Sequence, residues 1–449
     1  SKYEIKFLKN CKAQECLNKN REELMTVNIE QMVLNREEKP KNKVWMIAFV
    51  FSFLALLVDG ADIAFLSYSL TSLKQEFGLS NIQAGALGSW TLAGMAIGGF
   101  FGGWACDRFG RVRVIVIAIA LFSLLTCWLG FAQSYEQFKW LRFISAIGLG
   151  ALYIACNTLM AEYVPTKYRS TVLAGLMTGW TLGSVVATLL AGWLLPEFGW
   201  RYLFYIAIIP IVIAVAMHFL VPEPASWMES RRKRLNEKAS GMVEQKPKNT
   251  FEMIFQDALS RRMFILWSFS TAFLQFGYYG VSNWLPAYLE LDLGIKFKEM
   301  TMYMIGTFLI MMCTKVIAGI IADKIGRRAV FAFGTIGTAI FIPIIVFGNT
   351  PDNILWLMLF FGFLYGIPYG INATYMTESF STKVRGTAVG GAYNVGRLGA
   401  VLAPLTIGYF AQGGSIGTGL LIMGVAYFLC GLIPAFFIKD RLFDPQKAD

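Results

Sequence analysis

The sequence predicts an all-α integral membrane protein with twelve transmembrane helices in two pseudo-symmetric six-helix halves. Composition is the first observation: 56% of the 449 residues are hydrophobic and only 15% are charged, and the mean hydropathy is +0.53. A soluble fold of this length does not need so much apolar surface. Long apolar runs and an internal repeat are the second and third observations.

Apolar runs recur along most of the chain. A bilayer core of roughly 30 Å needs about 20 apolar residues in a helix. Such runs predict helices at 44–70, 82–106, 112–131, 137–163, 170–195, 200–221, 262–289, 299–322, 328–348, 354–378, 385–410 and 416–438. An even number of crossings places both ends of the chain on one side of the membrane.

Basic residues indicate the orientation. Short segments on one side are rich in Lys and Arg, among them DRFGRVR at 107–113 and DKIGRR at 323–328, whereas the loops on the other side are not. Cytoplasmic loops carry such an excess, so we expect a multi-pass protein of the inner cell membrane with both termini cytoplasmic. The net charge of +11 then reflects topology. A nucleic-acid partner is not expected, because its basic residues would gather on one soluble face.

An internal repeat divides the chain. GGWACDRFGRVR around Asp107 recurs as AGIIADKIGRRA around Asp323, and 323 − 107 = 216. A second motif pair, AEYVPTKYRSTVLAG and TESFSTKVRGTAVGG, aligns Glu162 with Glu378 and Arg169 with Arg385 at the same offset of 216. Two independent pairs at one offset indicate a duplicated unit.

The repeat and the polar stretch between its copies predict the domain organisation. We expect a cytoplasmic tail at 1–43, a first half at 44–221, a cytoplasmic linker at 222–261, a second half at 262–438 and a tail at 439–449. The linker holds RRKR and KPK and lacks a long apolar run.

The repeated loop motifs predict a charge network that holds one state of the protein closed. Gly103 lets helices approach closely, Gly110 permits a tight turn, and Asp107 can meet positive groups or a helix N-terminus. The predicted gating residues are Asp107, Arg108, Arg111, Glu162, Arg169, Asp323, Arg327, Glu378 and Arg385. The alternative is that these residues serve only as topology signals and helix caps.

These motifs resemble those of a known family. G-x-x-x-D-R-x-G-R at 103–111, its second copy at 319–327, and R-x-x-x-x-x-G-x-G at 142–150 resemble the major facilitator superfamily. The D-G-x-D motif at 59–62, and Arg385 and Arg397 twelve residues apart, resemble its aromatic acid:proton symporter branch. The resemblance covers about residues 44–440. It implies proton-coupled import, by alternating access, of benzoate-type or hydroxybenzoate-type acids or of ring-cleavage dicarboxylates such as muconate.

Three charged residues are expected inside the membrane in the first half. A helix that starts at 44 raises Asp62 roughly 27 Å above the cytoplasmic face, and one that ends at 163 holds Arg142 at roughly 30 Å. Asp59 lies one turn before Asp62, and burial disfavours two charges there, so one of them is expected to take up a proton. These three are the predicted proton-coupling residues. A permanent salt bridge that stiffens the half is the alternative.

Two cations are expected inside the second half. Arg397 lies about 18 Å into its helix, near the depth at which such carriers hold substrate, and its guanidinium matches a carboxylate. It could instead bond backbone carbonyls or an acid such as Glu378. Lys315, if it faces inward, supplies a second cation and favours a substrate with two carboxylates. It could instead extend to the cytoplasmic surface.

Aromatic residues complete the predicted substrate site. In the family that the chain resembles, helices one, four, seven and ten line the cavity, and tyrosine offers a flat face and a hydroxyl. The candidates are Tyr278, Tyr279 and Trp284 on helix seven, Tyr365 and Tyr369 on helix ten, and Tyr393 near Arg397. Each could equally be a packing residue.

The sequence favours a carrier over an enzyme. It has one histidine and lacks a metal-spaced ligand cluster or a nucleophile motif beside a base, so no catalytic residue, cofactor or metal is expected. The expected partners are a small organic acid, protons and the lipid bilayer, with the chain acting as a monomer. A sugar or drug carrier of the same fold is the alternative.

Overall fold

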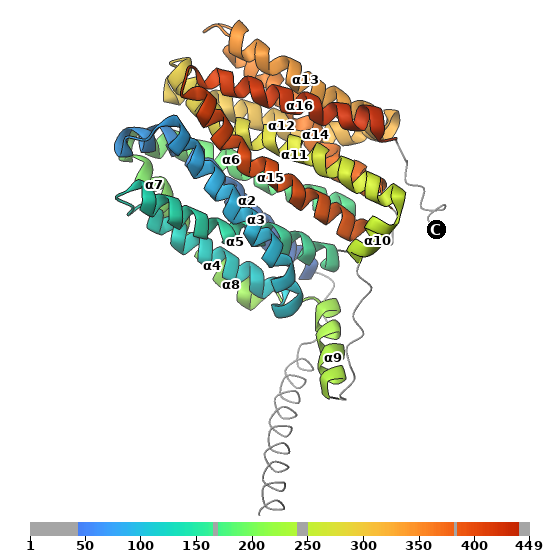
Figure 1. Cartoon of the computed structure of the whole chain (residues 1–449). Coiled ribbons are helices and arrows are strands. Elements are labelled where there is room, and N and C mark those ends of the chain that lie inside the picture. Colours follow the sequence, from blue (N-terminus) through green and yellow to red (C-terminus); the bar gives the residue numbers. More distant parts are fainter. Residues whose placement is uncertain (1–43, 165–168, 240–249, 381–383, 440–449) are drawn as a thin grey trace, which may run out of the picture.

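The computed structural model describes residues 44–164, 169–239, 250–380 and 384–439, which form helices joined by short connections. Figure 1 shows their arrangement. The helices are α2 (Val44–Phe77), α3 (Asn81–Phe109), α4 (Arg111–Leu129), α5 (Tyr135–Tyr163), α6 (Arg169–Phe198), α7 (Trp200–Tyr205), η2 (Ile206–Ile208), α8 (Ile211–Leu220), α9 (Ala225–Ala239), α10 (Thr250–Gln256), α11 (Ala258–Ala287), η3 (Tyr288–Asp292), α12 (Phe297–Ile325), α13 (Arg327–Gly348), α14 (Ile354–Glu378), α15 (Arg385–Ala411) and α16 (Ile416–Phe437).

Most predicted helices match these bounds to within a few residues, with two differences. The sixth crossing is not one continuous helix but α7, η2 and α8, because Pro210 at the N-cap of α8 cannot donate a backbone hydrogen bond. The first helix runs to Phe77 and not to residue 70, since the polar segment that follows residue 70 continues the helix beyond the apolar run.

The described helices are long and apolar enough to span a membrane. Ten segments of the described chain meet both criteria of length and hydropathy. The two remaining crossings, α11 and α15, have 30 and 27 residues and are therefore long enough for a bilayer core of roughly 30 Å. Their greater polarity places them where helices pack on helices, and α11 and α15 make extensive contact with each other.

Glycines set the close packing of α3 on α5. A Cβ at Gly98 would lie 1.9 Å from the carbonyl oxygen of Ile147, and one at Gly102 would lie 2.7 Å from Cα of Ala151. Small residues let two helices in lipid approach in this way. Gly103, which the motif suggested for this role, is wrong as the contact point, because its Cβ would find an ordinary neighbour at 4.0 Å.

The repeat seen in the sequence is also a structural repeat. Gly110 and Gly326 end α3 and α12 with φ of 111° and 100°, so each makes the tight turn that the motif predicted. Gly150 packs on the carbonyl of Met95, and Gly366 packs on the carbonyl of Met311, at the corresponding positions of the second half. The two six-helix halves therefore use the same internal contacts.

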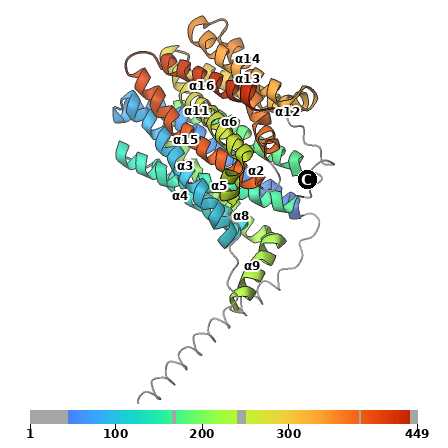
Figure 2. The same cartoon turned by 45° about the vertical axis from the view of Figure 1, so that its right-hand side comes forward.

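The halves meet along two helix pairs. Contacts between them run chiefly through α3 with α15 and α6 with α12, and α2 also touches α11. Figure 1 shows α13 and α16 on the outside of one half and α4 and α8 on the outside of the other, and Figure 2 shows α3 and α15 side by side from a second direction. Helices α9 and α10 lie at one end of the bundle, which we call the linker side, and the opposite end is the far side.

Polar contacts between the halves lie at the far side and at mid-depth. Asn81 at the start of α3 donates to the carbonyl of Ala411 at the end of α15 (2.9 Å). One turn or more inward, the amide of Leu405 donates to the hydroxyl of Ser89 (3.2 Å). This structure is therefore closed at the far side.

Candidate functional site

Asp62 and Arg142 form a fully buried ion pair in the first half. The guanidinium approaches the carboxylate to 2.6 Å, and the two side chains are 0% and 1% exposed. Arg142 also donates to the backbone carbonyl of Asp62 (3.1 Å) and to the hydroxyl of Thr91 (3.2 Å). Asp62 and Arg142, which the sequence placed at similar depths in the membrane, are therefore in direct contact.

Asp59 differs from Asp62 although it lies only one turn away. It is 0% exposed, and both of its carboxylate oxygens lack a hydrogen-bond partner within the described residues. The negative charge of Asp62 disfavours a second negative charge on Asp59, whereas the positive charges of Arg397 and Arg142 favour it. The next residue, Gly60, packs so closely that a Cβ would lie 2.1 Å from the carbonyl of Trp180. Helix α6 thus holds this turn of α2 in place.

Arg397 reaches from α15 of the second half into the first half. Its Nη1 donates to the backbone carbonyl of Met95 in α3 (2.8 Å), where the missing side chain of Gly99 leaves room for it. The guanidinium lies over the rings of Tyr153 and Tyr393, 6.0 and 5.8 Å from their centroids. Arg397 makes no ion pair with the described acids. Its contact with a backbone carbonyl matches the alternative stated from the sequence, and this carbonyl belongs to the other half.

Lys315 also crosses the boundary between the halves. Its ammonium donates to the hydroxyl of Thr181 in α6 (2.9 Å), and Thr181 is 0% exposed. Thr181 lies twelve residues from the linker-side end of α6 and Lys315 ten residues from that end of α12. The side chain therefore points level with the membrane interior in this structure and does not extend to the linker-side surface.

The repeat relates the contacts of these two cations. Lys315 occupies the position equivalent to Gly99 (315 − 99 = 216), and Arg397 the position equivalent to Thr181 (397 − 181 = 216). The pair Lys315 with Thr181 is therefore the pseudo-symmetric image of the pair Gly99 with Arg397. Both cations come from the second half, at equal depth, one on each flank of the boundary.

Tyrosines of α11, α14 and α16 form one cluster. The rings of Tyr278 and Tyr365 stack with centroids 5.2 Å apart, and Tyr278 lies 4.6 Å from Tyr369. The hydroxyl of Tyr365 donates to the carbonyl of Tyr278 (2.9 Å), and that of Tyr369 bonds to the hydroxyl of Tyr427 (3.0 Å). The ring of Tyr279 packs edge-on against that of Tyr278, with centroids 5.2 Å apart. Four predicted aromatic residues thus lie together.

The two remaining aromatic candidates lie elsewhere. Tyr393 stacks on Tyr153 of the first half, with centroids 6.3 Å apart and planes 8° apart. Trp284 is 0% exposed and donates to the carbonyl of Pro404 within its own half (3.0 Å). Trp284 therefore packs α11 against α15 and does not line the cavity described next.

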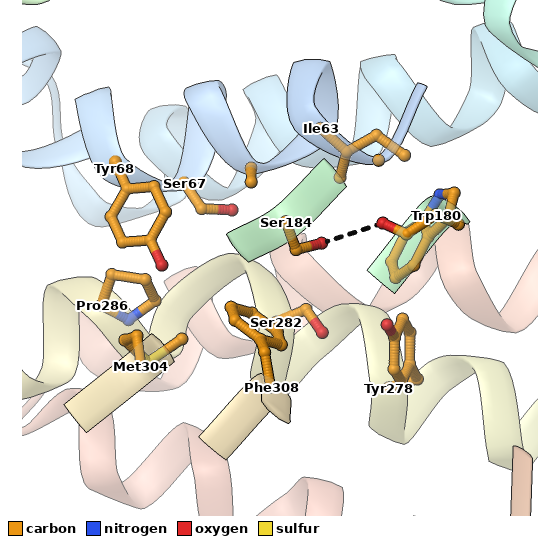
Figure 3. A pocket seen from close by; sticks show the side chains of 12 residues that line it. Ile63, Ser67, Tyr68, Trp180, Ser184, Tyr278, Ser282, Pro286, Met304 and Phe308 are labelled. Atoms are coloured by element: carbon orange, nitrogen blue, oxygen red, sulfur yellow. Dashed lines mark hydrogen bonds between the residues drawn. The ribbon is translucent and has the colours of Figure 1, made fainter. Parts of the chain in front are cut away.

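A small cavity lies at the boundary between the halves. Its volume is about 20 Å³, enough for a water molecule. Figure 3 shows Trp180 and Tyr278 facing each other at one end and Tyr68 with Pro286 at the other. The lining residues come from α2, α6, α11 and α12: Gly60, Ile63, Ala64, Ser67, Tyr68, Trp180, Ser184, Tyr278, Ser282, Pro286, Met304 and Phe308. The wall is mostly apolar and carries a few hydroxyls.

The first copy of the loop motif forms a charge cluster on the linker side. Arg111 contacts Asp107 (3.0 Å) and Glu162 (2.8 Å). The linker joins this cluster, because Ser226 donates to Glu162 (2.7 Å) and Trp227 donates to the carbonyl of Asp107 (3.0 Å). The linker therefore contacts this cluster directly.

Glu223 fixes the start of α4. It accepts backbone N–H bonds from Arg111, Val112 and Arg113 (2.7, 3.2 and 3.0 Å), as a carboxylate at a helix N-terminus does. Burial raises the pKa of Glu223, and the three N–H bonds partly offset this rise. The sequence interpretation missed Glu223, although its place in PEPASW beside a basic loop was a usable signal.

The second copy forms a matching cluster, which has no contact with the described part of the linker. Arg327 contacts Asp323 (2.5 Å) and Glu378 (3.2 Å). Arg108 lies outside both clusters, exposed over the ring of Trp104 at 5.7 Å. Arg169 and Arg385 begin α6 and α15, and their side chains lie outside the described part of the structure.

Comparison with known proteins identifies the class. The family model of the major facilitator superfamily matches residues 52–317 and 291–448, so the chain belongs to that superfamily. It is a multi-pass membrane transporter and not an enzyme. The crystal structure of a D-xylose-proton symporter has the same fold, with a TM-score of 0.72, 21% identity, and coverage of 88% of this chain and 98% of that chain.

Two relatives are similar along nearly their whole length. A cis,cis-muconate transport protein from Acinetobacter baylyi is 64% identical over 414 residues, which cover 92% of this chain and 99% of the relative. A benzoate transport protein from the same organism is 26% identical over 458 residues, which cover 94% of each.

Proposed function

We propose that the protein imports a small organic dicarboxylate of the muconate type, or a related aromatic carboxylate, together with protons. The observation that carries this proposal is the pair of cations, Arg397 and Lys315, at mid-depth between the halves. Neither makes an ion pair with an acid in the described chain, and a charge at that depth is costly unless it meets an opposite charge. The 64% identity to a muconate transport protein supports the same substrate class.

Proton coupling rests on Asp59. A buried carboxylate without a hydrogen-bond partner favours its neutral form unless a cation compensates it. The positive charge of Arg397 stabilises the negative form of Asp59, and Arg397 is also the residue proposed to bind substrate. Protonation of Asp59 would remove a negative charge that acts at Arg397 and so favour binding of an anion there, which links proton uptake to substrate binding.

Alternating access would follow from movement of one half against the other about the central site. In this structure the far side is closed by contacts such as Asn81 with Ala411. The ion pairs of each linker-side charge cluster lie within one half. The positive-inside rule places the linker side in the cytoplasm, so the structure would be inward-facing, with both termini cytoplasmic in the inner membrane.

Substrate competition tests the proposal. The purified protein would be placed in liposomes loaded with unlabelled cis,cis-muconate, and entry of labelled muconate would be followed while benzoate, hydroxybenzoate or xylose is added outside. We expect muconate to exchange, the aromatic acids to compete more weakly, and xylose to have no effect. Competition by xylose, or muconate exchange no faster than in empty liposomes, would contradict the proposed substrate class.

A further inference from the structure

We propose that Lys315 and Arg397 form a two-point site in which each cation binds one carboxylate of a dicarboxylate, with aromatic side chains lying along its carbon chain. This inference deepens the proposed function and rests on it. Its basis is that the repeat places two cations at equivalent contacts on the two flanks of the boundary.

At the Lys315 end of the site, the ammonium has a neutral partner and no anion among the described residues. Its partner in the described chain is the Thr181 hydroxyl at 2.9 Å, a neutral group that a carboxylate can displace. Thr181 follows Trp180, which lines the cavity of Figure 3. The ammonium therefore lies level with the end of the cavity formed by Trp180 and Tyr278.

The Arg397 end offers a fork. One guanidinium nitrogen donates to the Met95 carbonyl, and the other nitrogens make no hydrogen bond within the described residues. A guanidinium with free donors binds a carboxylate through two parallel bonds. The centroids of the stacked rings of Tyr153 and Tyr393 lie 6.0 and 5.8 Å from its central carbon.

Aromatic residues connect the two ends. Trp180 contacts Tyr278 with centroids 5.7 Å apart, and Tyr278 contacts Tyr279 at 5.2 Å. The stacked rings of Tyr153 and Tyr393 lie at the Arg397 end. A flat conjugated chain that runs from one cation to the other would lie against this series of rings.

A single carboxylate would leave one cation of the pair without an anion. That cation would return to a neutral partner, Thr181 or the Met95 carbonyl, and would add nothing to affinity. The two-point site therefore predicts a preference for dicarboxylates that depends on Lys315, whereas Arg397 serves both ligand classes.

The experiment compares two ligands that share the conjugated diene. cis,cis-Muconate has two carboxylates and sorbate has one, and binding of each to purified wild type and Lys315→Met would be measured by calorimetry. We expect Lys315→Met to weaken muconate by at least about tenfold and to leave sorbate within about twofold. Equal losses for both ligands, or no loss for muconate, would overturn the two-point site.

Two further variants distinguish the effect of the Lys315 charge from the effect of its hydrogen bond to Thr181. Thr181→Val removes the hydrogen-bond partner and keeps the ammonium, so the ratio of the two affinities should remain that of wild type. Lys315→Arg keeps the charge and should retain the preference for muconate if Lys315→Met folds poorly. If Thr181→Val reproduces the selective loss of muconate, the contact between the halves is what matters and the site is overturned. A wild type that binds neither ligand would refute the proposed function itself, before any variant is compared.

Discussion

Two aspartates one turn apart have opposite surroundings in this protein. Asp62 is held by Arg142 at 2.6 Å, while both oxygens of Asp59 lack a partner within the described residues. An ion pair fixed on several sides keeps its charge, whereas an unpaired buried acid changes its charge when its surroundings change. We infer that Asp59 carries the transported proton and that Asp62 with Arg142 is structural.

This division of roles predicts different mutant phenotypes. Asp59→Asn mimics the protonated acid, so it should abolish uphill accumulation of substrate while exchange across the membrane continues. Asp62→Asn leaves Arg142 buried without an acid, which costs about 3–5 kcal/mol, so it should lower the thermal unfolding temperature strongly. Transport and unfolding of both variants in the same preparation would check this. Uphill uptake by Asp59→Asn at the wild-type level would assign the proton elsewhere.

Substitution of Arg397 tests whether the site needs the two parallel hydrogen bonds of a guanidinium or only a positive charge. Arg397→Lys keeps the charge but cannot form two parallel bonds. We expect it to raise the dissociation constant for a carboxylate ligand about tenfold, or about 1.4 kcal/mol, while affinity for the amide analogue is unchanged. Calorimetry with acid and amide would measure both. Equal losses for the two ligands would mean that Arg397 shapes the helix and does not hold the anion.

At the scale of elements, helix packing depends on a few glycines. A Cβ at Gly98 of α3 would lie 1.9 Å from a backbone carbonyl of α5, whereas one at Gly390 of α15 would find nothing within 4 Å. Gly98→Ala should therefore destabilise the protein by about 1–3 kcal/mol, and Gly390→Ala should stabilise it by up to about 1 kcal/mol. Thermal unfolding in detergent would show whether each variant is less or more stable than wild type. A neutral Gly98→Ala would show that α3 and α5 can separate without cost.

The linker-side clusters yield a prediction about state balance. Asp107 is 71% exposed in its contact with Arg111, which is 10% exposed, and exposed ion pairs contribute only about 0–1 kcal/mol. Asp107→Asn should therefore shift the inward and outward populations by at most about fivefold, and Arg111→Gln, which also frees Glu162, should shift them more. Labelling of a single cysteine on the linker side would report the populations. A larger effect from Asp107→Asn would contradict this ranking.

Sequence reasoning succeeded where the signal was local or repeated. The apolar runs predicted the helices, and the offset of 216 predicted that Asp323, Arg327 and Glu378 repeat the cluster of Asp107. Arg108 shares the motif but lies outside the cluster, because neighbouring helix residues point in different directions. A break at Pro210 was missed, since a proline in an apolar run does not by itself end a crossing.

The rest of the site could not be predicted from one sequence. Thr181 and Met95 contact the two cations across the boundary between the halves, and such contacts depend on how separate helices are oriented. Neither residue type carries a charge or a motif that would mark it. The preference of Arg142 for Asp62 over Asp59 likewise depends on the rotation of α2 against α5.

At the scale of the whole molecule, the second half supplies two cations and the first half supplies the acids. We propose that substrate and proton both act at this boundary between the halves. Closure of the far side by contacts such as Asn81 with Ala411 then leaves one route of access. In the proposed transport cycle, opening of the far side would also change the contacts of Lys315 with Thr181 and of Arg397 with Met95, because both contacts join the two halves.

The most direct test of proton-coupled carboxylate import is accumulation driven by a pH gradient. Liposomes containing the protein, alkaline inside and acidic outside, would be given labelled cis,cis-muconate, and internal label would be followed with and without a protonophore. For proton-coupled import we expect accumulation above the external concentration that disappears when the protonophore collapses the gradient. Equal internal and external concentrations in the presence of the gradient, or accumulation that the protonophore does not change, would contradict it.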